Sequence, residues 1–189
     1  MEGIEVKDLG LKNYINLKPM LIPKTFGRHA KKQFHKSEDV NIVERLMNHL
    51  FVPGHRGKKH FKSSGQCVGK TMTALNIIKD SFDIVEKETK QNPVQVLVTA
   101  IENSALREEI TSFKMGGMSV RKAVIASPQR RVDLALRVIA QSSFQRATKG
   151  KKMAQALAEE LIAAYKQDSS RSNAIKEKER VEREAAGAR

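Results

Sequence analysis

Residues 128–160 combine two properties that are hard to reconcile in a folded segment. Their apolar side chains, from Val132 to Ile139 and beyond, recur three and four residues apart, which predicts helices with one buried face. Yet the stretch from Lys114 to Ala158 holds ten Lys or Arg residues and one acid, Asp133. A segment that folds despite this self-repulsion is typical of a surface that binds a polyanion.

The same apolar periodicity extends over most of the chain and predicts a mainly α fold of about six helices. Ser37 is the expected N-cap of the first helix, and Asn92 followed by Pro93 is a strong helix start, with Gln95 completing a capping-box pattern. The last segment is polar nearly all round, so we expect it to lie on a partner or to fray. The expected helices are 38–51, 71–90, one beginning at residue 93, 128–148, 151–166 and 172–186.

One stretch departs from helical spacing. Two strand-like runs, 110–115 and 118–125, flank Gly116 and Gly117. Two residues that tolerate positive φ between such runs predict a β-hairpin, here at 110–125. Because the helices supply the main apolar stripes, the hairpin is expected to protrude from the helical domain.

Residues 1–36 are expected to form an extended basic arm, followed by the helical domain with its hairpin at 37–189. Pro19 and Pro23 exclude a regular helix in the arm. From Lys24 to Lys36 there are five Lys or Arg residues, two His and no acid. The arm therefore adds a second cationic segment.

The overall charge narrows the class of partner. The formal net charge is +14 and the pI is about 10, which favours nucleic acid. Aromatic residues make up only 5% and Trp is absent, so phosphate contacts rather than base stacking should dominate binding. No anchoring amphipathic helix, long apolar run or signal-peptide pattern is present, so we expect no membrane partner and a cytoplasmic location. The single cysteine fits a reducing compartment.

The sequence contains no complete motif for an enzyme or a metal site. The letters SGQCVGKT at 64–71 differ from a phosphate-binding P-loop, which needs a Gly at the first position and a buried strand before it. His55, His60 and Cys67 are too few for a structural zinc site and lie among lysines. The acids, including Glu108 and Glu109, are interpreted as ordinary ion-pairing residues of helices. We therefore expect no enzymatic activity, metal or cofactor.

The predicted RNA-binding residues are the Lys and Arg side chains of the acid-poor stretches. Gly69, Lys70 and Thr71 form a helix start that can hold a backbone phosphate. Phe82, Phe113 and Phe144 are expected in the core rather than on bases. Three arginines that crowd one helix start, Arg130, Arg131 and Arg137, are expected at the centre of the surface. The full set is Lys24, Arg28, Lys31, Lys32, Arg56, Lys58, Lys59, Lys62, Lys70, Lys114, Arg121, Lys122, Arg130, Arg131, Arg137, Arg146, Lys149, Lys151 and Lys152.

Three groups of residues resemble a known family. They are Gly116-Gly117 in the hairpin, the run Pro128-x-Arg130-Arg131-x-x-x-Ala135-Leu136-Arg137-x-Ile139, and the run Lys152-Met153-Ala154-x-x-Leu157-Ala158-x-Glu160-Leu161. Together they resemble the ribosomal protein seven family of the small subunit. The arm at 14–29, YINLKPMLIPKTFGRH, and the long basic loop at 54–68 are similar to those of archaeal and eukaryotic members.

The resemblance implies a structural protein of the small ribosomal subunit that nucleates assembly of the subunit head. It implies binding to the 3′ major domain of small-subunit (16S-type) rRNA and contact with other head proteins. It also implies that the hairpin lies near mRNA and exit-site tRNA. The residues alone leave an alternative open, an architectural DNA-binding protein whose basic β-ribbon enters the minor groove. Such ribbons usually carry an apolar wedge at the tip, and here only Met115 and Met118 could serve.

Overall fold

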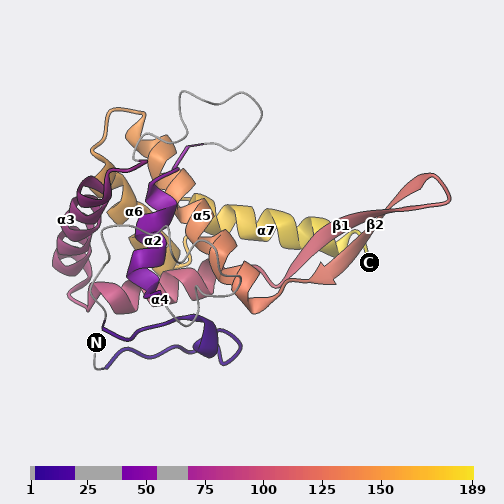
Figure 1. Ribbon diagram of the computed structural model, residues 1–189, viewed down its shortest axis with the longest axis horizontal. Coiled ribbons are helices and arrows are strands. Elements are labelled where there is room, and N and C mark those ends of the chain that lie inside the picture. Colours follow the sequence, from indigo (N-terminus) through magenta and orange to yellow (C-terminus); the bar gives the residue numbers. More distant parts are fainter. Residues whose placement is uncertain (1–2, 20–39, 55–67) are drawn as a thin grey trace.

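The computed structural model describes residues 3–19, 40–54 and 68–189, and within these ranges it is a helical body with one long projecting hairpin (Figure 1). The predicted mainly α fold is confirmed. No helix among these residues is long and apolar enough to cross a membrane. The elements are the 3₁₀ turn η1 (Lys12–Tyr14) and α2 (Ile42–Leu50), α3 (Thr71–Thr89), α4 (Pro93–Ser104), β1 (Glu108–Met115), β2 (Met118–Ile125), α5 (Pro128–Ala147), α6 (Met153–Tyr165) and α7 (Asn173–Ala186).

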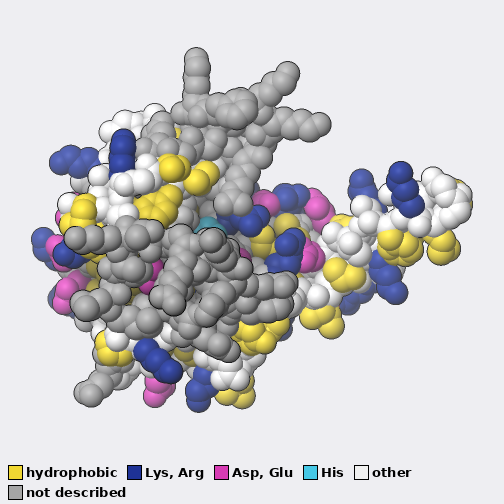
Figure 2. All heavy atoms as spheres, in the orientation of Figure 1, with side chains coloured by type: hydrophobic (Ala, Val, Ile, Leu, Met, Phe, Trp, Pro, Cys, Tyr) yellow, Lys and Arg dark blue, Asp and Glu magenta, His cyan; other side chains and the backbone are white. Residues whose placement is uncertain are grey.

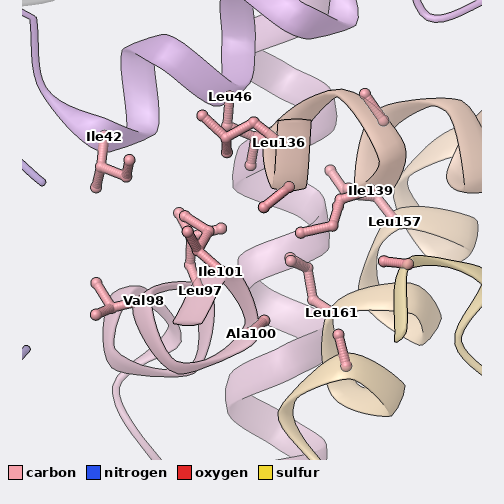
Figure 3. Packing of buried hydrophobic residues seen from close by; sticks show 14 of the residues in the cluster. Ile42, Leu46, Leu97, Val98, Ala100, Ile101, Leu136, Ile139, Leu157 and Leu161 are labelled. Carbon is pink, nitrogen blue, oxygen red and sulfur yellow. The ribbon is translucent and has the colours of Figure 1, made fainter. Parts of the chain in front are cut away.

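The core forms where the apolar stripes of α2 to α6 meet. Leu46 of α2, Ile101 of α4 and Leu136 of α5 are fully buried and point toward one another (Figure 3). α6 packs against α3, α4 and α5 and contributes Leu157 and Leu161. Each buried side chain of this size stabilises the folded state by about 1.5–3 kcal/mol, so this cluster holds the helical body together.

Side-chain caps begin α2, α4 and α7, whereas the Ser127 side chain expected to cap α5 makes no such bond. Asn92 accepts the Val94 N–H at 3.0 Å and Pro93 takes the first helical position, as predicted. The prediction of a first helix from residue 38 is wrong. α2 begins at Ile42 because Asn41, in extended backbone, accepts the Val43 N–H at 2.9 Å. Ser37 lies outside the described residues.

The described part of the N-terminal arm, residues 3–19, lies against the body instead of standing free. Leu11 and Ile15 are buried in the core. The expected capping box is wrong, because Gln95 bonds the arm: its Oε1 accepts the Glu5 N–H at 2.9 Å and its Nε2 donates to the Glu5 carbonyl at 3.1 Å. An arm-to-helix contact therefore replaces a contact within α4.

The β-hairpin is confirmed, and its strands are antiparallel with Met115 opposite Met118. Gly116 and Gly117 have φ of +57° and +85°, the positive values that the two-residue turn requires. Directly opposed residues share a face, so Phe113, Val120 and the two methionines lie on one side. Phe113 is 42% exposed, so its predicted place in the core is wrong.

The C-terminal helix α7 finds its partner within the same chain. It runs from the body to the root of the hairpin and contacts α5, β1 and β2 (Figure 1). Only Ala174, Ile175 and Ala185 are buried on it. Hydrogen bonds from Lys178 and Glu182 therefore add to these few buried side chains in holding the helix, which connects the body to the hairpin.

Candidate nucleic-acid interface

The outer half of the two-stranded hairpin carries exposed cations. Lys114 and Arg121 lie on one face and Lys122 on the other, as the pairing of Lys114 with Ser119 and of Thr111 with Lys122 requires. All three are exposed and make no ion pair with any described residue. Figure 2 shows blue Lys and Arg side chains along the ribbon and hydrophobic side chains gathered on one side of it. This arrangement can hold phosphates over a narrow, extended footprint.

A second group of exposed cations occupies the turn between α5 and α6. Gly150, whose φ is +94°, turns the chain here. Lys149 before it and Lys152 two residues after it make no ion pair with described residues. Lys151, between them, is 2.7 Å from Glu159. Of the three predicted lysines here, two keep their charge available for an external anion.

The start of α3 matches the prediction of a helix opening at Gly69, Lys70 and Thr71. Gly69 has φ +73°, Lys70 is exposed at the N-cap position, and an open groove of about 350 Å³ runs along residues 69–73. None of the described residues before α3 forms a strand, so the part of the chain that is described lacks the strand of a P-loop. The groove offers backbone N–H groups and one lysine, which suits a phosphate of any origin.

Two of the three arginines expected at the centre of the surface are paired with acids of this chain. Arg130 grips Glu109 with two bonds, Nε–Oε1 at 2.5 Å and Nη2–Oε2 at 2.7 Å. The hydrogen bond to Glu109 raises the pKa of Arg130. Arg131 donates from Nη2 to Asp8 at 2.9 Å and from Nε to the Leu106 carbonyl at 3.0 Å. Their role in RNA binding stays a prediction, now against competition from these carboxylates.

Arg137 and Arg146 are half-buried on α5 and directed into the protein's own interactions. Arg146 Nη2 lies 2.8 Å from Oε2 of Glu160, a carboxylate with no solvent exposure, and also donates to the Arg171 carbonyl. The other Glu160 oxygen accepts from Ser172 Oγ at 2.8 Å and from the Ala174 N–H at 3.0 Å. Glu160 therefore fixes the N-terminus of α7, a role that the sequence pattern did not predict.

Two further acids differ from their interpretation as helix ion-pairing residues. Glu108 and Glu109 lie on β1, and each pairs with an arginine that is distant in sequence. Glu108 accepts two bonds from Arg189 Nη2, at 2.5 and 2.6 Å, and these bonds lower the pKa of Glu108. The interpretation was wrong because helical spacing says nothing about partners 21 or 81 residues away.

The remaining predicted cations lie outside the described residues. These are Lys24, Arg28, Lys31, Lys32, Arg56, Lys58, Lys59 and Lys62, together with the zinc candidates His55, His60 and Cys67. In the part of the chain that the structure does describe, no three His, Cys, Asp or Glu residues are grouped to hold a metal ion.

Most of the chain matches one protein family in sequence. Residues 11–189 match the family model described as Ribosomal protein S7p/S5e. The chain is similar to the small ribosomal subunit protein uS7 of Nanoarchaeum equitans, with 49% identity over all of this chain and 94% of the relative. It is similar to the proteins of the same name from Methanococcoides burtonii, 47% identical over 98% of this chain and 94% of the relative, and Methanococcus maripaludis, 46% identical over 100% and 94%.

Proposed function

The chain belongs to the ribosomal protein S7p/S5e family, and from that premise we propose how it acts within the small ribosomal subunit. It is a structural, non-enzymatic protein of that subunit, with rRNA and other ribosomal proteins as its partners. We propose that it binds the 3′ major domain of the small-subunit rRNA and nucleates assembly of the head. The same proposal has the hairpin reach toward mRNA and exit-site tRNA.

The observation that carries the proposal is the set of exposed cations without an acid partner among the described residues. On the hairpin these are Lys114, Arg121 and Lys122, and at the α5–α6 turn they are Lys149 and Lys152. Each such side chain can neutralise a phosphate and release a condensed counterion, which makes binding favourable and salt-dependent. A basic surface that lacks compensating acids is typical of proteins that contact a nucleic-acid backbone.

The slim hairpin supports a place between RNA strands. A two-stranded ribbon whose tip is Gly116 and Gly117 has no bulky side chain at its turn, so it fits where a helix, about 10 Å across, does not. Its apolar side with Phe113, Met115 and Met118 offers contact with base faces or sugars beside the cations. The resemblance to the family motifs supports the proposed direction of the hairpin, toward mRNA and exit-site tRNA.

Binding of the full chain to a transcript of the 3′ major domain tests the proposal. We expect the apparent Kd to rise steeply with salt, with a log–log slope of about 0.7–0.9 per phosphate neutralised. An equal-length transcript of another rRNA domain and a DNA duplex serve as controls. Preference for the 3′ major domain supports the proposal. Equal binding to all rRNA domains would contradict the domain assignment, and preference for duplex DNA would favour the architectural DNA-binding alternative.

A shortened hairpin tests the second half of the proposal. Replacing residues 114–122 by a two-residue turn should leave the thermal midpoint of unfolding and entry into small subunits nearly unchanged, because the outer strands bury no core residue. Subunits carrying this variant should release exit-site tRNA faster or lose reading-frame fidelity. Unchanged tRNA retention and fidelity would show that the tip only fills space.

A further inference from the structure

The hairpin is joined to the body by two short connections, residues 105–107 and 126–127. Charged side chains bond the first of them and the end of α4 that precedes it. Lys178 Nζ donates to the Asn103 carbonyl at 2.8 Å and Glu182 Oε1 accepts the Arg107 N–H at 2.8 Å. Both of these side chains come from α7. The two connections also bond each other, Ala126 N–H to the Arg107 carbonyl at 3.0 Å. The root is therefore bonded to the helix that runs beside it.

Just beyond this root, one arginine holds each face of the hairpin. Glu108 and Glu109 are consecutive on β1, so their side chains lie on opposite faces of the ribbon. Arg189, at the end of the chain, pairs with Glu108, and Arg130, in the first turn of α5, pairs with Glu109. The two arginines come from different elements and contact the ribbon from opposite sides, so together they oppose tilting in either direction.

We propose that Arg130 and Arg189 are positioning residues that set the angle of the hairpin relative to the helical body. This inference deepens the proposed function, since it rests on the hairpin's task of delivering its tip to RNA. Arg130 forms a two-bond grip in which Nε and Nη2 of the guanidinium meet the two carboxylate oxygens of Glu109, a geometry that fixes direction as well as distance. Arg189 brings the last residue of the chain to the ribbon, where the Ala188 carbonyl also accepts the Ala123 N–H of β2 at 3.4 Å.

The length of the ribbon makes the root decisive for the tip. β1 has eight residues, and at about 3.3 Å per residue the ribbon extends roughly 26 Å beyond its root. A tilt of about 10° at the root then moves the tip by about 5 Å, more than the reach of a hydrogen bond. Exposed ion pairs of this kind add little to global stability, but they select one orientation among several of similar energy.

Spin labels on the free, full-length protein measure this angle directly. With Cys67 replaced by Ser, one label goes on the hairpin at Ser119→Cys and one on the body at Gln155→Cys, both exposed positions. Pulsed electron paramagnetic resonance then gives the distribution of distances between the two labels. We expect one narrow peak for the parent protein. In the Arg130→Ala, Arg189→Ala variant we expect a peak about twofold broader or displaced, with the thermal midpoint within a few degrees of the parent.

The chain offers a matched control in Arg180 of α7. Arg180 is 54% exposed against 53% for Arg130, and it pairs with Glu177 and Glu184 inside its own helix. Arg180→Ala removes one positive charge, as Arg130→Ala does by itself, and the same kind of ion pair, without touching the hairpin. Its distance distribution should match that of the parent, so a broadening there would assign the effect to net charge.

Exchange of the paired residues separates positioning from other roles. The variant Arg130→Glu, Glu109→Arg, with Arg189 intact, should restore the narrow peak that Arg130→Glu alone loses. A parent-like distribution in Arg130→Ala, Arg189→Ala would overturn the proposal, and so would failure of the exchange to restore the peak. Binding to the 3′ major domain is measured separately on the same proteins. If the parent shows no preference for this domain over other rRNA domains, the proposed function is refuted, but the distance result still stands.

Discussion

The outer half of the hairpin and its root carry similar numbers of cations and use them differently. At the outer half, Lys114, Arg121 and Lys122 face solvent without an acid partner among the described residues. At the root, Arg130 and Arg189 each hold a carboxylate of β1. The difference shows that a positive sequence stretch is not one surface. Acids from elsewhere in the chain pair with some of its cations and so stabilise the fold. The other cations remain available to an external polyanion.

The helical body also contains a paired cation, and this one is buried. Arg45 is 2% exposed, lies 3.0 Å from Asp133 and donates to the Tyr14 carbonyl at 2.8 Å. Burial lowers the pKa of Arg45 while Asp133 opposes that shift, so the charged arginine depends on its partner. Paired cations therefore range from buried ones that hold the core to exposed ones that set an angle.

The largest stability loss is expected where a paired cation is most buried. Arg45→Met should lower the free energy of unfolding by about 3 kcal/mol, because Asp133 loses its bond from a buried arginine and the Tyr14 carbonyl loses its donor. Arg121→Met, on the exposed ribbon, is the matched control and should change it by less than about 0.5 kcal/mol. Denaturant unfolding of both proteins gives the comparison, and equal losses would remove the distinction between paired and unpaired cations.

A smaller loss is expected at the junction of α6 and α7. Glu160→Ala should cost about 2–3 kcal/mol, since Arg146 loses its buried partner and the start of α7 loses two bonds. The neighbouring Glu159 is 41% exposed, and Glu159→Ala should cost less than about 1 kcal/mol. Thermal unfolding at neutral pH checks both. A loss at Glu159 as large as that at Glu160 would show that charge alone matters in this region.

The ion pair between the arm and α5 should respond to acid. Burial acts to raise the pKa of Asp8, but the bonds from Arg131 and the Gly10 N–H outweigh it and lower the pKa below the ordinary 3.8. A carboxyl whose pKa is lower in the folded than in the unfolded state stabilises the fold when the pH is above its unfolded-state pKa. That contribution is lost as the pH falls through its folded-state pKa. Asp8→Asn should therefore lower the thermal midpoint at pH 6 and make progressively less difference below about pH 4.

The matched control for Asp8 is Asp80→Asn, on the exposed side of α3. This change also removes one negative charge but leaves the Asp8–Arg131 contact of the arm in place, so the midpoint difference should stay small over the same pH range. If Asp8→Asn kept its full effect at pH 3, hydrogen bonding rather than charge would hold the arm.

Much of the fold was predictable because it depends on local signals. Asn92 and Pro93 set the start of α4, and Gly116-Gly117 set the turn of the hairpin, through contacts within a few residues. The start of α2 was not predictable in the same way. Ser37 and Asn41 are both good caps by residue type, and the choice of Asn41 is tied to the arm, because its Nδ2 donates to the Lys18 carbonyl at 2.7 Å and the Ile42 N–H to the Asn16 carbonyl at 3.0 Å.

The candidate site was predictable in composition but not in its division. Basic residues and the scarcity of nearby acids pointed to a polyanion, and the chain proved to belong to a ribosomal protein family. The acids that neutralise Arg131 and Arg130 come from 123 and 21 residues away along the chain. Such pairings depend on the tertiary fold, so charge counts along the sequence overstate the cations that face outward.

The dependence of rRNA affinity on salt, measured for two variants beside the parent, tests the central claim most directly. The outer variant is Lys114→Ala, Arg121→Ala, Lys122→Ala, and the root variant is Arg130→Ala, Arg131→Ala. With a 3′ major domain transcript, the outer variant should lower the log–log slope by about 2–3, at about 0.7–0.9 per lost phosphate contact, and keep its thermal midpoint. The root variant should lower the slope by less than the outer variant does, because Glu109 and Asp8 already hold these two arginines. It should also lower the midpoint, because Arg131 holds the arm. A root variant that loses slope while the outer variant keeps it would contradict the claim.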